Sequence, residues 1–428
     1  MSHRAAVIGA GPSGFYATEQ LLKAGFAVDL YEALPTPFGL VRAGVAPDHP
    51  KIKSVTRVYE KTAQHPDFRF FGGVELGKDI SREELLERYH AVVYAIGTST
   101  DNRLGIPGED RPGSHSATEF VAWYNGHPDF ADHEFDLSAT RAIVIGNGNV
   151  AVDVARMLVL DPDEVAVTDT ADHAVEGLAD CGVQEVIVLG RRGPAQAAFT
   201  TPELRELGEM TRADIVVDPF DEVDESELET GTKRNLDVLR DYAQRESTGK
   251  ERRVELRFFY SPVEILGEGE DGPVTGVRVV KNALVDGRAV PTDEEHVISC
   301  GLVFRSIGYR GVPVADIPWD DKRGLIRNEG GRVAPGEYVV GWVKRGPSGV
   351  IGTNKKDSAD TVARILEDRE AGALNEPTVV PEAPEGAITW EGWCAIDDVE
   401  TAAGEAQGRP RVKLVRVAHM HDAAQAKA

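Results

Sequence analysis

Short runs of apolar residues recur along the chain, and the first is followed by an amphipathic stretch. Residues 4–9 form an almost continuous apolar run, which predicts a buried strand, and apolar positions at helical spacing continue to a stopping Gly25. A second apolar run at residues 27–31 ends on Glu32. The pattern therefore predicts a strand, a glycine-rich turn, a helix and a second strand that ends on an acid.

The same pattern begins again in the middle of the chain. Residues 141–145 predict a buried strand, and a second glycine-rich turn and apolar positions at helical spacing follow. The next apolar run, residues 186–189, comes after an acidic stretch at residues 161–180, which we expect to be a loop. This strand ends on Gly-Arg-Arg instead of an acid. The repetition predicts an α/β protein with two related units.

Other segments suggest how the two units are connected. The apolar runs at residues 91–96 and 302–307 each end on glycine, and we interpret each as a crossover between the units. Residues 371–386 are rich in Pro, Glu, Gly and Asn, which is typical of a linker. The Ala- and Lys-rich end after His419 is expected to be frayed.

The first glycine-rich turn has the GxGxxG spacing of a dinucleotide-binding loop. The first glycine permits the tight turn, the second lets the backbone approach a pyrophosphate, and the third lets the helix pack on the strand. The helix N-terminus then faces an anion, and Glu32 is placed to accept hydrogen bonds from ribose hydroxyls. The predicted nucleotide contacts here are Gly9, Gly11, Pro12, Ser13, Gly14 and Glu32.

The second turn replaces the third glycine with Ala151, which the fingerprint tolerates because that position governs helix packing. Arg191 and Arg192 stand where the first unit has its acid, and guanidinium groups pair with a 2′-phosphate that a carboxylate would repel. This favours NADP(H) over NAD(H), and the alternative is a surface arginine pair without a ligand. The predicted contacts are Gly146, Gly148, Asn149, Val150, Arg191 and Arg192.

Two dinucleotide sites with unlike strand ends suggest a flavin dinucleotide beside a nicotinamide dinucleotide, with hydride transfer between them. Charge, apolar run length and cysteine content argue against several other classes of protein. A net charge of -24 over 428 residues argues against nucleic-acid binding, and no apolar run approaches the roughly 20 residues of a membrane-spanning helix.

The three cysteines, Cys181, Cys300 and Cys394, form no CxxC pair and no cluster with metal-ligand spacing. We therefore expect no disulfide framework, no bound metal and no internal redox dithiol, so the terminal electron acceptor is a separate molecule. Because the first strand begins after a few residues, we expect no leader peptide and a cytoplasmic location.

Several longer runs are more specific than a spaced glycine motif. They are residues 9–14, LPTPFGLVR at 34–42, GVAPDHPKIK at 44–53, residues 146–156, GRRGP at 190–194, AFTTPELRE at 198–206, RSIGYRG at 305–311 and GWVKRGPSGVIGTNK at 341–355. On these runs, and over nearly its whole length, the chain closely resembles the adrenodoxin reductase type of ferredoxin–NADP reductase, most of all the actinobacterial members.

The resemblance implies a fold of two Rossmann-like dinucleotide-binding domains of the glutathione reductase type, with a discontinuous FAD domain. The expected division is residues 1–100 and 307–428 for FAD, the second part including a C-terminal extension, and residues 101–306 for NADP. The implied FAD contacts are Glu32, Leu40, Val74, Trp342, Gly349, Val350 and Ile351. The implied NADP contacts are Asn149, Val150, Arg191, Arg192, Glu203 and Gly349, and Thr353 is a further predicted cofactor contact.

The resemblance also places His49 and Glu206 close to the nicotinamide and flavin rings, as the predicted catalytic pair. Taken alone, His49 is a loop histidine between prolines, for which a capping or surface role is equally reasonable. Glu206 alone belongs to a helical repeat of acids that is usually a solvated face. In the C-terminal part of the chain we expect a helix at residues 358–366, whose N-terminus would stabilise negative charge on the flavin.

The activity implied is that of an FAD-dependent ferredoxin–NADP⁺ reductase that passes electrons between NADPH and a separate iron–sulfur ferredoxin, feeding iron–sulfur or cytochrome P450 redox chains. Two alternatives stay open: a flavin-dependent NADPH oxidase or monooxygenase, and a non-catalytic nucleotide-binding redox sensor. For the ferredoxin, the basic segment at residues 233–257 is the candidate docking surface, unless its interleaved acids neutralise it.

Overall fold

The computed structural model describes residues 3–349 and 351–426, and the chain divides into two compact units. The described residues of unit 1 lie within 1–100, 125–128 and 309–428, and those of unit 2 within 101–124 and 129–308. The chain passes between the units shortly after two buried strands, at residues 100–101 and 308–309. The return of residues 125–128 to unit 1 has no counterpart in the sequence pattern.

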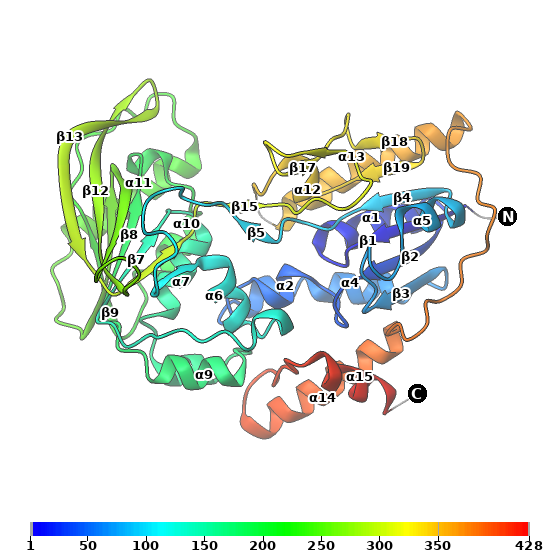
Figure 1. Ribbon diagram of the computed structural model, residues 1–428, viewed down its shortest axis with the longest axis horizontal. Coiled ribbons are helices and arrows are strands. Elements are labelled where there is room, and N and C mark those ends of the chain that lie inside the picture. Colours follow the sequence, from blue (N-terminus) through cyan, green and yellow to red (C-terminus); the bar gives the residue numbers. More distant parts are fainter. Residues whose placement is uncertain (1–2, 350, 427–428) are drawn as a thin grey trace. The chain divides into compact units, whose positions relative to one another are not determined.

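The sheet of unit 1 has six strands in the order β18-β19-β4-β1-β2-β3 (Figure 1). All neighbours are parallel except the antiparallel pair β18 and β19. The bounds are β1 (Arg4–Ile8), β2 (Ala27–Glu32), β3 (Phe68–Gly72), β4 (Ala91–Tyr94), β18 (Arg332–Ala334) and β19 (Glu337–Val339). Because β1 is central and parallel, it is covered on both faces, which explains its run of apolar residues.

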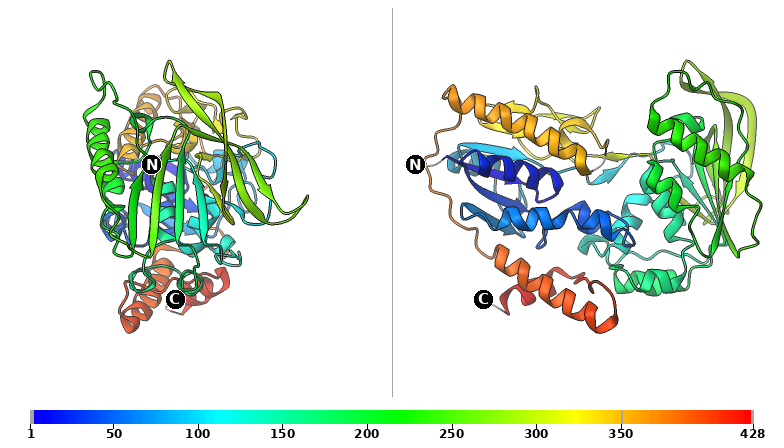
Figure 2. Two further views of the ribbon diagram at one scale, coloured as in Figure 1. Left: turned by 90° about the vertical axis from the view of Figure 1, so that its left-hand side faces the viewer. Right: turned by 180° about the vertical axis from the view of Figure 1, so that it is seen from behind.

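Alternate residues of β1 face two different buried clusters. Ala5 and Val7 pack with residues of α1 and α13, and Ala6 and Ile8 pack with Leu85 of α5. Figure 2 shows α1 and α13 running side by side on one face of the sheet. The helices of unit 1 are α1 (Pro12–Lys23), α2 (Leu40–Ala43), α3 (Pro50–Lys53), α4 (Thr56–Ala63), α5 (Arg82–Arg88), α12 (Trp342–Arg345), α13 (Ile351–Glu370), α14 (Trp390–Gln407) and α15 (Val417–Gln425).

Two of these helices differ from the sequence prediction. Helix α13 begins at Ile351 and ends at Glu370, so it is longer at both ends than the predicted helix at residues 358–366. The described residues after His419 are not frayed, because α15 continues to Gln425 and its Met420 is almost fully buried. The linker before α14 is confirmed, since no helix or strand lies between Glu370 and Trp390.

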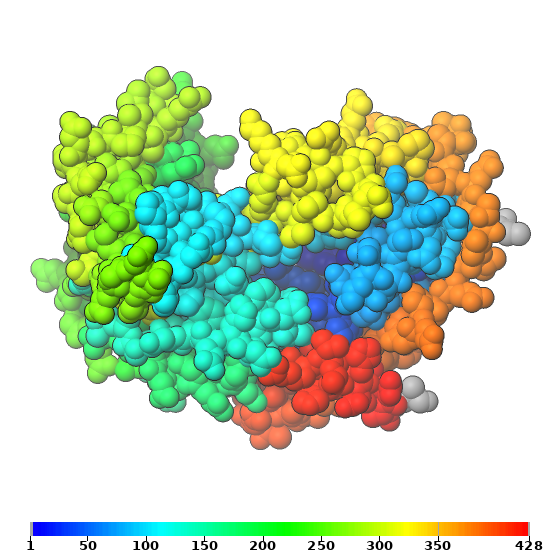
Figure 3. Space-filling view, in the orientation of Figure 1, coloured from blue at the N-terminus to red at the C-terminus, as the bar shows by residue number. Residues whose placement is uncertain are grey.

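The last two helices pack onto the N-terminal half of unit 1. Trp393 and Ile396 of α14 and Met420 of α15 belong to the same buried cluster as Phe38 and Phe70. In the space-filling view, the red C-terminal residues lie beside the blue N-terminal ones (Figure 3). The chain end is therefore part of the core of unit 1, which neither composition nor periodicity indicates.

The sheet of unit 2 also has six strands, in the order β6-β14-β7-β8-β10-β9, and every neighbouring pair is parallel. The bounds are β6 (Ser114–Ser116), β7 (Arg141–Ile145), β8 (Glu185–Gly190), β9 (Ala213–Val217), β10 (Arg252–Phe258) and β14 (Leu302–Arg305). A separate antiparallel sheet contains β11 (Tyr260–Gly267), β12 (Val274–Val285) and β13 (Arg288–Ser299). Two units with parallel sheets confirm the predicted α/β class with two Rossmann-like domains.

The helices of unit 2 show where the loop prediction was wrong. They are α6 (Ala117–Tyr124), α7 (Asn149–Met157), α8 (Pro162–Ala166), α9 (Asp172–Ala179), α10 (Thr201–Glu206) and α11 (Thr230–Gln244). The acidic stretch at residues 161–180 contains α8 and α9 because the Asp161 side chain caps the first turn of α8 and Leu178 of α9 is buried.

The remaining short elements are β5 (Thr100–Asp101), β15 (Tyr309–Arg310), β16 (Trp319–Asp320), β17 (Leu325–Ile326) and the 3₁₀ turns η1 (Pro128–Phe130) and η2 (Pro194–Gln196). The first two strands pair with each other, and so do β16 and β17. None of the helices that the structure describes has both the length and the apolar character of a membrane span.

Candidate cofactor-binding sites

The first glycine turn follows β1 at the point where the strand order of the sheet reverses. The chain leaves β1 toward β2 and β3 on one side, and β4 lies on the other side of β1. Open parallel sheets bind ligands at this switch point, in the crevice beyond the carboxyl ends of the strands. The topology therefore places residues 9–14 where a nucleotide site is expected.

Each glycine of this turn has a separate steric role. Gly9 has φ +107°, and a Cβ there would lie 2.5 Å from the Ala95 carbonyl oxygen. A Cβ at Gly14 would lie 1.9 Å from the Gly9 oxygen, so this position carries the close packing of helix on strand. A Cβ at Gly11 would meet nothing within 4 Å. The open space beside Gly11 is what the approach of a pyrophosphate requires.

Helix α1 begins immediately after this open position. Pro12 occupies the first turn, where the missing N–H costs no hydrogen bond, and Ser13 is buried beside Gly341. The Ser13 carbonyl oxygen accepts a hydrogen bond of 3.0 Å from the Ser358 hydroxyl of α13. The first turn of α1 is thus fixed, and its free N–H groups and dipole favour an anion.

Glu32 ends β2 and already holds the turn. Its carboxylate accepts hydrogen bonds from the backbone N–H groups of Ala10, at 2.8 Å, and Leu34, at 3.2 Å. Burial raises the pKa of the Glu32 carboxyl, and these backbone N–H groups oppose that rise. The acid predicted to bind ribose therefore lies directly beside the glycine turn, with an orientation set by the backbone.

The C-terminal half of unit 1 adds a polar group that has no partner. Trp342 begins α12 after Gly341, whose φ is +78°, and the Trp342 indole Nε1 is buried without a hydrogen-bond partner among the described residues. Asp357 of α13 accepts a hydrogen bond of 2.6 Å from the Gly341 backbone N–H. A buried indole N–H without an acceptor fits a ligand that has carbonyl or ring-nitrogen acceptors, as a flavin has.

The other residues predicted to contact FAD have varied surroundings. Val74 is almost fully buried, whereas Leu40 is 38% exposed. Gly349 has φ +79°, and a Cβ there would lie 2.5 Å from the Thr353 hydroxyl. Ile351 is the first residue of α13, two positions after this glycine. Val350, another predicted contact, lies outside the described residues.

The second glycine turn repeats the arrangement in unit 2. It follows β7, with β8 on one side and β14 on the other, so it also lies at a switch point. Gly146 has φ +123°, and a Cβ there would lie 2.0 Å from the Ser306 carbonyl oxygen. A Cβ at Gly148 would have no neighbour closer than 3.9 Å. Ala151 is fully buried in the position of the third glycine.

Arg191 and Arg192 follow the last residue of β8. Their backbone oxygens accept hydrogen bonds from the Asn282 side chain, at 2.8 Å, and from the Phe259 N–H, at 3.2 Å. Among the described residues, neither guanidinium group makes a hydrogen bond or an ion pair. The backbone is fixed while both charged ends stay available, which is the arrangement that a phosphate needs.

Residues that follow the second turn connect it to α10. The Asn149 side-chain oxygen accepts a hydrogen bond of 2.8 Å from the Thr200 N–H, and Val150 packs against the core of unit 2. Glu203 of α10 is buried, and Glu206 forms an ion pair of 3.5 Å with the buried Arg156 of α7. These two acids are therefore not part of a solvated helix face, which was the alternative interpretation of the sequence.

His49 belongs to unit 1 and Glu206 to unit 2. His49 directly precedes α3, its side chain is 6% exposed, and its Nε2 lies 3.9 Å from the Asp48 carboxylate. A surface role for His49 is therefore excluded. The proposed proximity of both residues to the cofactor rings stays a prediction.

Comparisons with known proteins identify the family of this chain. The family described as pyridine nucleotide-disulphide oxidoreductase matches residues 3–187. NADPH-ferredoxin reductase FprA of Mycobacterium tuberculosis is 49% identical to this chain, covering 97% of each protein. This chain belongs to the NADPH-ferredoxin reductase family. The mitochondrial NADPH:adrenodoxin oxidoreductase of Salvelinus fontinalis, 40% identical over 99% of this chain and 92% of its own length, is a further relative.

A solved structure of M. tuberculosis FprA in complex with NADPH matches the described fold with a TM-score of 0.94 and 48% identity. The match covers 99% of this chain and 100% of that chain. Membership in the NADPH-ferredoxin reductase family confirms the resemblance that the sequence runs predict. The roles of individual site residues are not tested by these matches and stay predictions.

The basic segment predicted to dock the reductase on its partner is largely neutralised. Arg240 pairs with Glu225, at 2.6 Å, and Arg245 pairs with Asp241, at 2.8 Å. Further along the segment, Arg252 is buried and donates to backbone carbonyls, Arg253 pairs with Glu185, and Arg257 pairs with Glu255. Acids within the segment pair with Arg245 and Arg257, as the alternative interpretation of the sequence predicts. The closest partners of Arg240 and Arg253 are acids outside the segment, so its own acids neutralise it only in part.

Proposed function

We propose that this protein is an FAD-dependent ferredoxin–NADP⁺ reductase, with FAD held by unit 1 and NADP(H) by unit 2. The observation that supports this most directly is the pair of glycine turns at the two switch points, followed by unlike strand ends. The strand in unit 1 ends on Glu32, whose carboxylate accepts hydrogen bonds from the backbone. The strand in unit 2 is followed by Arg191 and Arg192, whose guanidinium groups have no partner among the described residues. When bound, FAD would supply the conversion between the two-electron hydride chemistry of NADPH and single-electron transfer to an iron–sulfur protein.

In unit 1, the residues bind and orient the flavin dinucleotide. The open position at Gly11 and the N-terminus of α1 receive the pyrophosphate, and Glu32 accepts hydrogen bonds from ribose hydroxyls. Trp342 donates its unpartnered indole N–H to the flavin, and the N-terminus of α13 stabilises negative charge on it. Leu40 and Val74 supply apolar contacts.

In unit 2, the residues select the phosphorylated nicotinamide nucleotide. Gly148 leaves room for the pyrophosphate, and Arg191 and Arg192 bind the 2′-phosphate.

His49 and Glu206 position the reacting rings and set the local field, since hydride transfer between two rings needs alignment and no nucleophile. Glu206 acts here together with Arg156, its ion-pair partner.

The proposed electron acceptor is an iron–sulfur ferredoxin, and the printed sequence itself contains no cysteine cluster that could hold an iron–sulfur centre. On unit 2, the exposed Arg205 and Arg234 have no ion-pair partner among the described residues. They border a groove of about 400 Å³ between α10 and α11, which Glu209, Asp237 and Asp241 also line. We place the docking surface there, on these two arginines and not on the paired arginines of residues 240–257. The cytoplasmic location stays a prediction that cell fractionation would test.

The decisive experiment reduces the purified yellow protein with NADPH in the absence of oxygen and then adds candidate ferredoxins. A reductase is bleached by NADPH and recovers its colour as the ferredoxin is reduced. An oxidase would instead consume NADPH rapidly with oxygen alone. A redox sensor would bind both nucleotides and show negligible turnover with every acceptor.

A further inference from the structure

A fully buried carboxylate joins the C-terminal helices to the N-terminal half of unit 1. Glu400 of α14 is 0% exposed and accepts hydrogen bonds from Arg42, at 2.5 and 2.8 Å, and from Arg411, at 3.0 Å. Its Oε1 also accepts a hydrogen bond of 2.8 Å from the Leu414 N–H. Burial by itself would raise the pKa of the Glu400 carboxyl, but Arg42 and Arg411 hold it below its ordinary value.

Arg42 lies near the end of the segment at residues 34–43, which lies against the first glycine turn. Within this segment, the Phe38 N–H donates to the Ala10 carbonyl oxygen at 2.9 Å. A Cβ at Gly39 would lie 3.0 Å from the Gly11 Cα. Phe38 has φ +84°, a conformation that non-glycine residues keep only where their surroundings hold them. The position of this segment therefore decides how much space is open beside Gly11.

The C-terminal residues hold the same segment by its backbone as well. Lys413 Nζ donates to the Arg42 carbonyl oxygen at 3.2 Å and to the Asn125 carbonyl oxygen at 3.1 Å. The Arg42 guanidinium lies over the Trp393 ring, 5.4 Å from its centroid. Trp393 also packs edge-on against the strained Phe38, at 5.5 Å between ring centroids.

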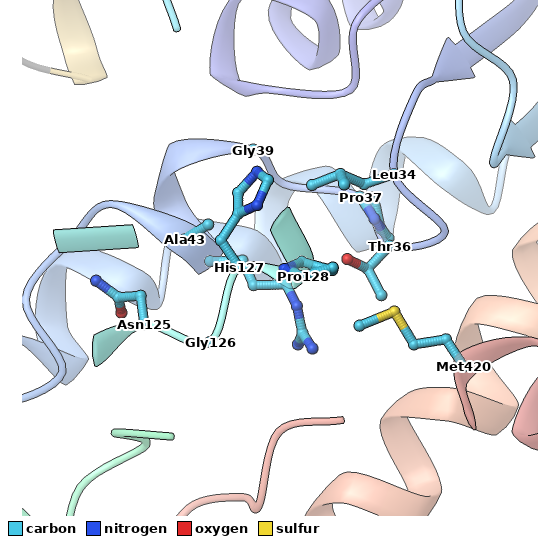
Figure 4. A pocket seen from close by; sticks show the side chains of 11 residues that line it. Leu34, Thr36, Pro37, Gly39, Ala43, Asn125, Gly126, His127, Pro128 and Met420 are labelled. Carbon is cyan, nitrogen blue, oxygen red and sulfur yellow. The ribbon is translucent and has the colours of Figure 1, made fainter. Parts of the chain in front are cut away.

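Residues 34–43, residues 125–128 and helix α15 meet around a small pocket. Figure 4 shows the small pocket that remains there, with Met420 of α15 pointing toward Thr36. The pocket has a volume of about 10 Å³, which is the space of roughly one water molecule. The close packing means that a displacement of Arg42 moves the segment as a whole.

We propose that Glu400 is a positioning residue for the flavin site, acting through Arg42 to hold residues 34–43 against the first glycine turn. The inference rests on the assignment of that turn to FAD. It makes the C-terminal helices part of the structure that retains the cofactor, although no residue of α14 or α15 was predicted to contact FAD. With Glu400 neutral, Arg42 loses its carboxylate partner, and the segment that Arg42 anchors loosens. Arg411 still pairs with Asp397, at 2.5 Å, so the effect falls mainly on Arg42.

The test compares FAD affinity in two isosteric variants of the same helix. Glu400→Gln keeps the shape and removes the charge, and Glu405→Gln is the matched control, because Glu405 is exposed on α14 and has no ion pair among the described residues. We expect the dissociation constant for FAD, measured by flavin fluorescence, to rise about tenfold or more in Glu400→Gln and to stay within about twofold in Glu405→Gln.

Binding of NADP⁺ to the same preparations is the internal reference, because unit 2 contains no residue of this network. Glu400→Gln with unchanged NADP⁺ affinity and weakened FAD affinity supports the proposal. A well-folded Glu400→Gln protein with the FAD affinity and visible circular dichroism of the wild type overturns it. If wild-type protein itself fails to bind FAD, the assignment of the first turn is wrong instead.

Two further variants keep the test decisive if Glu400→Gln does not fold. Arg42→Lys preserves the charge but loses the two-pronged contact, and Glu400→Asp preserves the charge but shortens the reach. Each is expected to retain FAD less tightly than wild type, with an altered circular dichroism of the bound flavin. Wild-type affinity in both variants contradicts the positioning role.

Discussion

The two glycine turns have the same construction, but the strand that follows each ends differently. In unit 1, the Glu32 carboxylate accepts hydrogen bonds from the backbone N–H groups of Ala10, in the glycine turn, and Leu34. In unit 2, the guanidinium groups of Arg191 and Arg192 have no partner among the described residues. One site is thus largely organised by the fold, and the other is completed by its ligand.

This difference matches the roles of a resident cofactor and an exchanging one. A preorganised acid loses little conformational freedom when a ribose binds, so the binding energy is retained as affinity. Each arginine side chain loses about 2 kcal/mol of conformational freedom when it is fixed on a phosphate. The comparison teaches that the residues after one strand can decide whether a nucleotide is retained or exchanged, while the two glycine turns remain alike.

The largest effect is expected when the acid of unit 1 is replaced by the residue type found in unit 2. Glu32→Arg removes the acceptor for two backbone N–H groups and puts a cation in a half-buried place, at a cost on the order of 1–3 kcal/mol for each N–H left without an acceptor. We expect the protein to lose its yellow colour on gel filtration. Full retention of FAD with unchanged affinity would show that the first turn has been misassigned. Glu391→Arg, on an exposed position of α14, is the control.

The second prediction addresses the arginine-ended strand. Replacing Arg191 and Arg192 with alanine should weaken NADPH use far more than NADH use, by about 1.5–3 kcal/mol for each charged contact that is lost. Steady-state kinetics with both nucleotides measure the effect, and bound FAD should be unchanged. A double variant that still prefers NADPH to the same degree would return the pair to a surface role without a ligand.

A smaller effect is expected from the predicted catalytic pair. His49→Gln and Glu206→Gln should keep FAD bound while the rate of hydride transfer or the affinity for nicotinamide changes by roughly tenfold, because these residues adjust alignment and field. Stopped-flow reduction by NADPH measures both quantities. Traces identical to wild type in both variants would leave these residues with structural roles only.

The smallest effect concerns the partner surface of unit 2. Charge reversal of Arg205 and Arg234 should slow turnover with ferredoxin roughly two- to fivefold and reduce its salt dependence, because exposed charges act mainly on encounter. Reduction of ferricyanide, which needs no docking site, should not change. Arg288→Glu on the exposed hairpin strand β13 is the matched control. Equal ferredoxin kinetics in all variants would place the interface elsewhere.

The sequence predicts those parts of the molecule whose signals are local. The run from β1 to Glu32 is recognisable because apolar strands, glycine spacing and the acid all lie within one short stretch. Helix α15 was not predicted, since its order depends on Met420 packing into a cluster with residues far away in the chain. Helices α8 and α9 were missed for the same reason, because buried apolar residues outweigh their acidic composition.

The candidate sites follow the same rule. Glycine roles and the unlike strand ends can be inferred from residue type and spacing. The free indole N–H of Trp342, the contact of Asp357 with Gly341 and the ion pair of Glu206 with Arg156 cannot, because each depends on how distant segments meet. Pairing of the basic segment was foreseen only as an alternative, since the sequence shows which charges are near and not which ones touch.

The order in which a ribosome delivers this chain has a consequence for how unit 1 is completed. Strand β4 emerges early, but its neighbour β19 and the helix α13 that covers α1 emerge only after all of unit 2. At a synthesis rate of roughly 5–20 residues per second, the sheet of unit 1 stays incomplete for a time on the order of tens of seconds. During that interval its apolar face is open to chaperones or to aggregation. Unit 1, whose first strands are the first to leave the ribosome, is therefore the last unit to become a closed domain.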